Sequence, residues 1–219
     1  MVSYRKEGNT VKSETIQASY HLFSFLLRYP TRDHLEAVDE ITAFSESIEE
    51  ESIRKTLVEF LSVISNWNQD QWVEHYIEVF DFGKTSNLYM TYLKLGEQKE
   101  RGLELLKLKK FYEAAGFDVT DKELPDYLPL MLEFCAAIDQ EVRIEFLSKH
   151  AAAIAETKSK LEKLESSYYL LLEALIKLMS YEGVVVSTDH SQKEERPLSL
   201  EDVRIMQSMR EQLIQNQLG

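Results

Sequence analysis

Five histidines and one cysteine are the side chains of this sequence that most often carry out chemistry near neutral pH. None of the histidines lies three residues after a glutamate, as in di-iron helical bundles, and none forms a His-x-x-x-His pair for zinc. They are His21, His34, His75, His150 and His190. We expect the adjacent pairs Asp33–His34 and Glu74–His75 to be solvated surface groups, because neighbouring residues point in different directions on a helix. Metal binding is not indicated.

The only cysteine, Cys135, lies in the apolar run MLEFCAAI and has no neighbouring Cys or His that would activate it. We expect it to be a small buried residue, and its lack of a disulfide partner fits a reducing cytosol. The seven glycines are too scattered for a phosphate-binding loop, so no cofactor is indicated. We expect no enzyme, and a small helical hydrolase or nucleotide-using enzyme is the weaker alternative.

The composition favours a helical, acidic protein. The chain has 219 residues with only 7 Gly and 4 Pro, and its formal net charge is −13. This charge opposes nucleic-acid binding, which needs a basic face, and suits a basic protein or peptide partner. We find no signal peptide and no apolar run long enough for a membrane span, so we expect a cytoplasmic protein that does not insert into membranes.

The elements that must position any site are helices. Apolar residues recur at spacings of three and four through most of the chain. The pattern predicts an all-α, single-domain bundle of about eight to ten helices. The expected segments are 13–29, 33–45, 48–67, 70–80, 87–95, 97–115, 128–138, 139–163, 165–181 and 199–217. We expect a loose N-terminus over 1–12, a helical domain over 13–183, and a linker with a semi-detached helix over 184–219.

Local signals mark several helix ends. Ser13 can cap the first helix, and Asn68 or Asp70 can start the fourth. Gly116 is typical of a helix stop, and Pro125 is tolerated at the mouth of the helix that follows it.

Charge is distributed unevenly along the chain. Residues 36–59 carry eight acids and only two bases, whereas six bases outnumber three acids between positions 94 and 110. One interpretation is solvated helix faces of opposite sign. The other is an acidic wall that attracts a basic peptide, together with a basic helix that steers an anionic group.

The unusual residues are concentrated between Tyr76 and Phe134. Trp72, Tyr76 and Phe80 have the spacing of core residues, whereas other aromatics lie beside loops, charges and two prolines. Prolines fix backbone angles, so a binding surface that lies between two prolines stays preorganised. We predict a peptide groove in which Asp126 caps a helix start or pairs with a peptide cation. Its candidate residues are Tyr76, Phe80, Asp81, Leu88, Tyr89, Tyr92, Leu124, Pro125, Asp126, Tyr127, Leu128 and Glu133.

Four short motifs in this order resemble the NarJ branch of the redox-enzyme maturation chaperones. This family is also described as the nitrate reductase delta subunit or molybdenum cofactor assembly chaperone, and is related to TorD and DmsD. The motifs are YHLFSFLLRYP at 20–30, FDFGKTSNLYMTY at 80–92, RGLELLKLKKFYEAAGF at 101–117 and ELPDYLPLMLEF at 123–134. The likeness covers roughly residues 15–182. One departure is Tyr127, where the family usually has a histidine, so a role of that histidine does not carry over.

The resemblance implies a TorD-like, all-helical cytoplasmic chaperone that is not an enzyme. It implies binding to the N-terminal leader of the nitrate reductase alpha (catalytic) subunit, and contact with molybdenum cofactor delivery proteins. The apoenzyme would be held until the molybdenum cofactor and an iron–sulfur cluster are inserted and membrane attachment can proceed. A helical scaffold that binds an unrelated peptide is the alternative. Leaders of this kind are basic and amphipathic, which suits an acidic receptor with an aromatic groove.

Overall fold

The computed structural model describes residues 4–81, 86–95, 99–118 and 123–186. Over these residues it consists of nine α-helices and one π-helical turn, without a β-strand. The prediction of an all-α bundle with about eight to ten helices is therefore confirmed. The predicted last helix at 199–217 lies outside the described residues.

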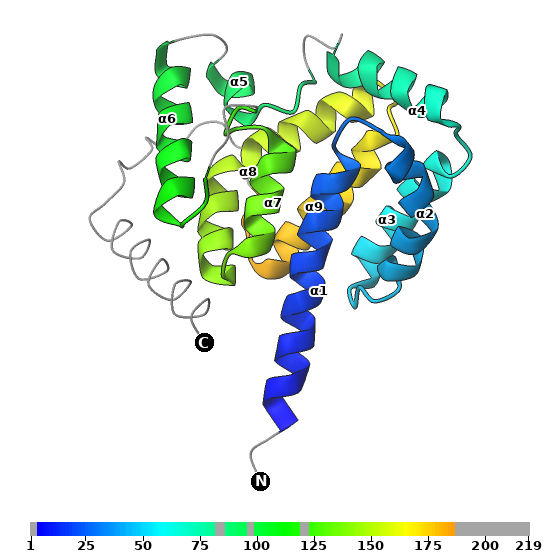
Figure 1. Cartoon of the computed structure of the whole chain (residues 1–219), viewed down its shortest axis with the longest axis horizontal. Helices are drawn as coiled ribbons and strands as arrows, with labels where there is room; N and C mark the ends of the chain where they lie inside the picture. Colours follow the sequence, from blue (N-terminus) through cyan, green and yellow to red (C-terminus); the bar gives the residue numbers. More distant parts are fainter. Residues whose placement is uncertain (1–3, 82–85, 96–98, 119–122, 187–219) are drawn as a thin grey trace.

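The helices follow one another with short connections (Figure 1). They are α1 (Tyr4–Leu26), α2 (Arg32–Ser45), α3 (Glu51–Ile64), α4 (Gln69–Tyr76), the π-helical turn η1 (Ile77–Asp81), α5 (Met90–Leu95), α6 (Lys99–Ala114), α7 (Leu128–Ala137), α8 (Gln140–Lys163) and α9 (Tyr168–Glu182).

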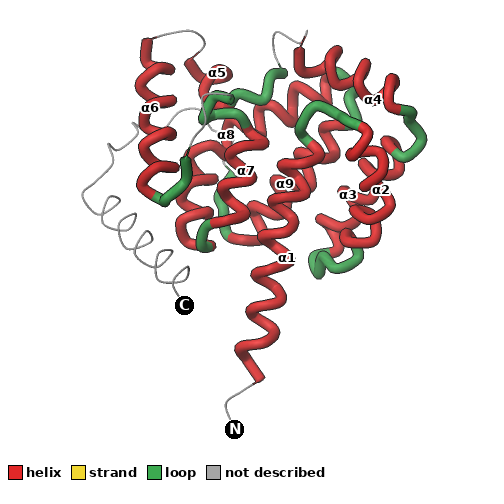
Figure 2. Tube along the Cα trace, in the orientation of Figure 1, coloured by secondary structure: helices red, strands yellow, loops and turns green. Residues whose placement is uncertain are grey.

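The core forms where α1 packs on α7 and where α9 packs on both α3 and α8. In Figures 1 and 2, α1 crosses the middle of the view, with α2–α4 on one side and α5–α6 on the other. The first turns of α1 project beyond the other helices. Aromatic and aliphatic side chains from every helix between α1 and α9 fill a continuous buried cluster, to which α5 contributes Met90.

Several helix ends follow the local signals. Asn68 caps α4, because its side chain accepts a hydrogen bond from the Gln71 amide and the Gln71 side chain accepts one from the Asn68 amide. Gly116 ends α6 with a φ of 86°, and Gly183 ends α9 with a φ of 106°. Both lie in the left-handed region that glycine adopts without steric cost.

One predicted helix start and one predicted proline position differ from the structure. The first helix begins at Tyr4, so Ser13 lies inside it and caps nothing. No proline interrupts this stretch, and serine is tolerated within a helix. The proline in the first turn of α7 is Pro129, whereas Pro125 precedes the helix. The predicted start of this helix at Leu128 is correct, but the prediction that Pro125 is its first-turn proline was wrong.

A buried arginine joins four helices. Arg143 on α8 donates to both carboxylate oxygens of Glu182 on α9, at 2.7–3.2 Å. It also donates to the carbonyls of Cys135 and Ile138 at the end of α7, at 3.0 and 2.8 Å. Its guanidinium lies over the ring of Tyr20 on α1, whose hydroxyl donates to Glu182 at 2.6 Å. We call this group the arginine hub.

His34 is buried, and the prediction that it is a solvated surface group was wrong. Its ring stacks on Phe25 with centroids 4.0 Å apart and meets the edge of Trp72. One ring nitrogen bonds the Thr31 amide, and the other bonds the Phe25 carbonyl. Burial lowers the pKa of His34. His75 is also partly buried, with Ser166 as its hydrogen-bond partner.

Removing the hub arginine should strongly destabilise the fold. Arg143→Met leaves Glu182 buried without its cation, so we expect a loss of about 3–5 kcal/mol in the free energy of unfolding. Urea denaturation of the purified variant measures this loss. As a control, Lys149→Met breaks only the half-exposed pair with Glu145 and should cost less than about 1 kcal/mol. Equal losses in both variants would contradict the central role of the hub.

Acid should destabilise the fold in part through His34. Because the pKa of His34 is lowered in the folded state, the unfolded chain binds more protons below about pH 6.5. Stability should therefore fall as the pH drops through 6.5 towards the folded-state pKa. Urea denaturation at several pH values between 8 and 5 should show a shallower loss for His34→Gln than for the parent protein. Parallel pH profiles of the two proteins would refute this assignment.

Candidate functional site

The segment before α5 pairs with the segment before α7. The amide of Met90 donates to the carbonyl of Asp126 at 3.0 Å, and the amide of Leu128 donates to the carbonyl of Leu88 at 2.8 Å. These bonds form an isolated antiparallel bridge between Tyr89 and Tyr127. The bridge brings the two most unusual stretches of the sequence into direct contact.

The side chain of Asp126 fixes the start of α5. It is fully buried, and its Oδ2 atom accepts hydrogen bonds from the amide and the hydroxyl of Thr91, at 3.1 and 2.5 Å. Arg101 of α6 approaches the same oxygen at 3.5 Å and lies over the ring of Tyr92. A carboxylate at a helix N-terminus stabilises the exposed amides there. Asp126 therefore holds α5 and α6 against the segment that precedes α7. A peptide cannot reach its buried carboxylate in this conformation.

The first proline of the motif is also internal. Pro125 is buried, and its carbonyl accepts a hydrogen bond from the hydroxyl of Tyr112 on α6 at 2.7 Å. The ring of Tyr112 packs edge-on against Phe134 of α7, with centroids 4.7 Å apart. Pro129, the second proline, accepts a hydrogen bond at its carbonyl from Ser24 of α1. Both prolines are therefore buried residues that support the site as its frame, and neither is part of its exposed surface.

Four tyrosines form a continuous row beside this frame. Tyr29 meets the ring of Tyr76 edge-on at 5.6 Å. The hydroxyls of Tyr76 and Tyr127 lie 3.4 Å apart, and the rings of Tyr127 and Tyr89 are 5.4 Å apart. We call Tyr29, Tyr76, Tyr127 and Tyr89 the tyrosine row. Only Tyr76 within it is buried; Tyr89 and Tyr127 are partly exposed, and Tyr29 is 47% exposed.

Half of the predicted groove residues are therefore inside the protein. The buried ones are Tyr76, Phe80, Leu88, Pro125, Asp126 and Leu128. The partly or fully exposed ones are Asp81, Tyr89, Tyr92, Leu124, Tyr127 and Glu133. The buried residues are closed to a peptide in this structure, so only the partly or fully exposed ones remain candidates for direct contact.

Polar groups border the row. The hydroxyl of Tyr89 donates a hydrogen bond to Glu123 at 2.9 Å, and Arg28 forms an ion pair with Glu133 at 2.5 Å. Burial raises the pKa of Tyr127, so its hydroxyl stays neutral at physiological pH. The region offers flat apolar rings, neutral hydroxyl groups and carboxylates. This combination suits binding of a peptide with apolar and cationic side chains.

Sequence reasoning missed Arg28, Tyr29 and Glu123 as members of this surface. The available signal was the Tyr29-Pro30 pair, because the residue before a proline leaves helical geometry. At this helix end, Tyr29 turns its ring towards Tyr76 of α4. Arg28 and Glu123 follow only from contacts with residues distant in the sequence.

The described residues contain no arrangement typical of catalysis by a metal or a thiol. No group of three His, Cys, Asp or Glu side chains among them is placed to hold a metal ion. Cys135 is fully buried, and its burial raises the pKa of the thiol, which keeps it protonated and unreactive. Within the same part of the chain, no helix is both long and apolar enough to cross a membrane.

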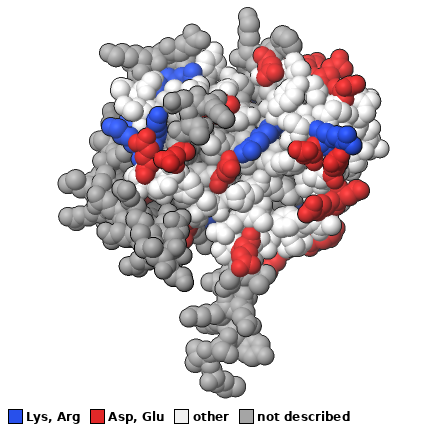
Figure 3. All heavy atoms as spheres, in the orientation of Figure 1, with Lys and Arg blue, Asp and Glu red and all other residues white. Residues whose placement is uncertain are grey.

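The acidic stretch is a solvated surface with local ion pairs. The acidic side chains visible in Figure 3 gather mainly on the side occupied by α2 and α3. Lys55 pairs with Glu51, and Arg32 pairs with Glu36, each one turn apart on a helix. Such exposed pairs contribute little to stability. The excess of acids remains available to attract a cationic partner over longer distances.

Comparison with known proteins places the chain in a family. It is 40% identical over 173 residues to the probable nitrate reductase molybdenum cofactor assembly chaperone NarJ of Bacillus subtilis strain 168, which covers 79% of this chain and 94% of that protein. It is 31% identical over 160 residues to NarJ of Escherichia coli K12, described as a nitrate reductase molybdenum cofactor assembly chaperone, covering 72% of this chain and 67% of that protein. A third relative, the probable chaperone NarW of the same strain, is 32% identical over 136 residues, which are 62% of this chain and 56% of NarW.

These relatives are named as assembly chaperones and not as catalytic enzymes, which agrees with the expectation from the sequence. The pattern that defines the nitrate reductase delta subunit family matches residues 46–172. This range contains the Tyr89–Tyr127 bridge, Asp126 and most of the tyrosine row. The chain belongs to the nitrate reductase delta subunit family.

Proposed function

We propose that this protein is a chaperone that binds the N-terminal segment of the apo nitrate reductase catalytic subunit. It supports molybdenum cofactor insertion and enzyme assembly before membrane attachment. The names of the relatives support a role in nitrate reductase assembly. The observation that carries the proposal of peptide binding is the partly exposed tyrosine row, with carboxylates at its edge.

The row would bind the apolar side of an amphipathic leader. Tyr29, Tyr127 and Tyr89 offer flat ring surface, and Leu124, which is 40% exposed, extends the apolar area next to Glu123. Tyrosine gives a large contact area with little rotamer freedom to lose on binding. Leader residues one helical turn apart would contact successive rings by the helix-in-groove mode.

The bordering acids would receive the cationic side of the leader. Glu123 accepts one hydrogen bond from Tyr89 and keeps further acceptor capacity. Glu133 is half-exposed, and its partner Arg28 is a surface residue that a leader cation can replace. Asp81 is exposed at the end of η1. The net charge of −13 would speed the encounter, while apolar contacts would set the lifetime of the complex.

The buried half of the motif would keep this surface in place. Asp126 and Pro125 fix the bridge that carries Tyr89 and Tyr127. The two tyrosines therefore lose little conformational freedom when a peptide binds. Preorganisation of this kind improves affinity by lowering the entropy lost on association. Asp126 therefore contributes as a positioning residue and not as a direct partner of the leader.

The proposed setting is the cytoplasm, where the apoenzyme would be held until its cofactors are inserted. Proteins that deliver the molybdenum cofactor are further proposed partners. The alternative is a helical scaffold that binds a peptide unrelated to nitrate reduction. Affinity capture from cells that express nitrate reductase separates the two, because only the chaperone recovers the apo catalytic subunit.

Truncation of a row tyrosine should weaken leader binding. Calorimetric titration of the synthetic N-terminal peptide of the catalytic subunit should show about tenfold weaker binding by Tyr89→Ala, or about 1.4 kcal/mol. Tyr169→Ala, on α9, removes a similar partly exposed ring and serves as the control. Equal affinities of Tyr89→Ala and the control, with both folded, would place the peptide elsewhere.

Leader binding should also depend on salt. Raising the ionic strength from about 0.05 M to about 0.5 M shortens the screening length several-fold and should weaken binding about fivefold. The same titration with Glu123→Gln should show a smaller salt effect than with the parent protein. An affinity that stays constant across this range would rule out the contribution of the bordering acids.

A further inference from the structure

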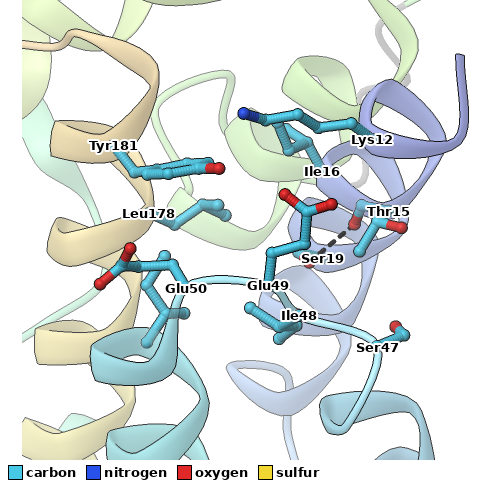
Figure 4. A pocket seen from close by; sticks show the side chains of 11 residues that line it. Lys12, Thr15, Ile16, Ser19, Ser47, Ile48, Glu49, Glu50, Leu178 and Tyr181 are labelled. Carbon is cyan, nitrogen blue, oxygen red and sulfur yellow. Dashed lines mark hydrogen bonds between the residues drawn. The ribbon is translucent and has the colours of Figure 1, made fainter. Parts of the chain in front are cut away.

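A hollow lies on the part of the molecule where α1 projects from the bundle (Figure 4). Its walls come from the middle of α1, the connection between α2 and α3, and the end of α9. Lys12 and Thr15 belong to the first wall, Ser47 and Glu49 to the second, and Tyr181 to the third. The cavity between these walls has a volume of about 70 Å³ and opens to solvent.

The floor of the hollow is apolar and small. Ile16, Ile48, Ile53 and Leu178 form it, and each of them is buried. Because little of their surface is accessible, the floor has room for the methylene stem of one long side chain and not for a whole helix. Lysine and arginine bury their stems on such surfaces while their charged groups remain in water.

The upper part of the hollow already holds an ammonium group. Lys12 reaches across from α1 towards the ring of Tyr181, and its Nζ atom lies 4.6 Å from the ring centroid (Figure 4). Contact with Tyr181 raises the pKa of Lys12, and the charge of Glu49 adds to this shift. Glu49 points into the same space, and Glu50 forms the rim beside it. The side chains around the hollow are therefore arranged to receive a cation.

We propose that this hollow is a socket for one lysine or arginine side chain of a partner protein, and that Lys12 occupies it until the partner binds. The incoming stem would lie on Ile16 and Leu178, and its charged group would take the place of the Lys12 ammonium between Tyr181 and Glu49. Lys12 is exposed, so it can move into solvent when it is displaced. A basic residue between aliphatic residues has the chemistry that this socket recognises.

The socket is separate from the tyrosine row. Ser24, which contacts the frame of the row through Pro129, follows Lys12 on α1 by twelve positions. At the rise of an α-helix this is roughly 18 Å. The socket therefore does not depend on the proposed leader binding, and the two sites can be tested independently.

The test is an NMR titration of the ¹⁵N-labelled full-length protein with the peptide acetyl-Leu-Lys-Leu-amide. We expect saturable shifts of the amides of residues 47–50 and 178–183, and about threefold weaker binding by Tyr181→Leu, which keeps apolar bulk but loses the cation–π contact. Acetyl-Leu-Gln-Leu-amide, without the charge, should cause much smaller shifts. Tyr89→Ala should leave the titration unchanged. Equal shifts with both peptides, or shifts centred on the tyrosine row, would overturn the proposal.

A second variant tests the role of Lys12. Lys12→Gln removes the resident cation, so the peptide should bind about threefold more tightly. Lys163→Gln, at the exposed end of α8, makes the same change in net charge far from the socket and should have a smaller effect. If the two variants strengthen binding equally, the effect is one of overall charge and Lys12 does not occupy the site. If Lys12→Gln weakens binding, Lys12 supports the ligand and does not compete with it.

Discussion

The arrangement of the bundle depends on one buried cation. Arg143 satisfies the carbonyl groups that end α7, pairs with the carboxylate of Glu182 on α9 and lies over Tyr20 of α1. A buried charge is costly unless it is paired and hydrogen-bonded, and here nearly every donor of the guanidinium has a partner. A buried ion pair by itself adds little net stability, but the contacts of Arg143 join α1, α7, α8 and α9 at one point. The hydrophobic contacts of α1 with α7 are formed in this arrangement.

The site is built on the second constraint, the pairing of Leu88–Met90 with Asp126–Leu128. Backbone hydrogen bonds fix the register of these two segments, and the Asp126 carboxylate binds the first turn of α5. Asp126 uses only its Oδ2 atom in this way; its buried Oδ1 atom has no hydrogen-bond partner among the residues that the structure describes.

Much of the fold follows from the sequence because helices are specified locally. The Asn68 capping box and the glycine ends at Gly116 and Gly183 use partners within a few residues, and the apolar spacing within each helix is equally local. The same reasoning selected the candidate region through its clustered aromatics and prolines. It did not find that Asp126 and Pro125 are buried, because their partners Thr91 and Tyr112 are 35 and 13 positions away.

His34 illustrates the same limit. Its sequence neighbours are charged, which suggests a solvated residue, yet Phe25 and Trp72 from two other parts of the chain enclose its ring. The extension of α1 to Tyr4 was missed for a different reason. A polar stretch without proline is compatible with either a helix or a loose end, and its composition does not decide between them.

The two proposed surfaces share one rigid element. The socket lies beside Ile16 on α1, the arginine hub contacts Tyr20 one turn further, and Ser24 after another turn binds the frame of the tyrosine row. The hub is thus positioned between the two surfaces and holds α1 against α7, α8 and α9. Because α1 is fixed at its middle, the distance between the surfaces does not vary with the motion of a loop. A partner that carries two basic segments would meet both surfaces at a constant separation, which raises the effective concentration of the second segment once the first is bound.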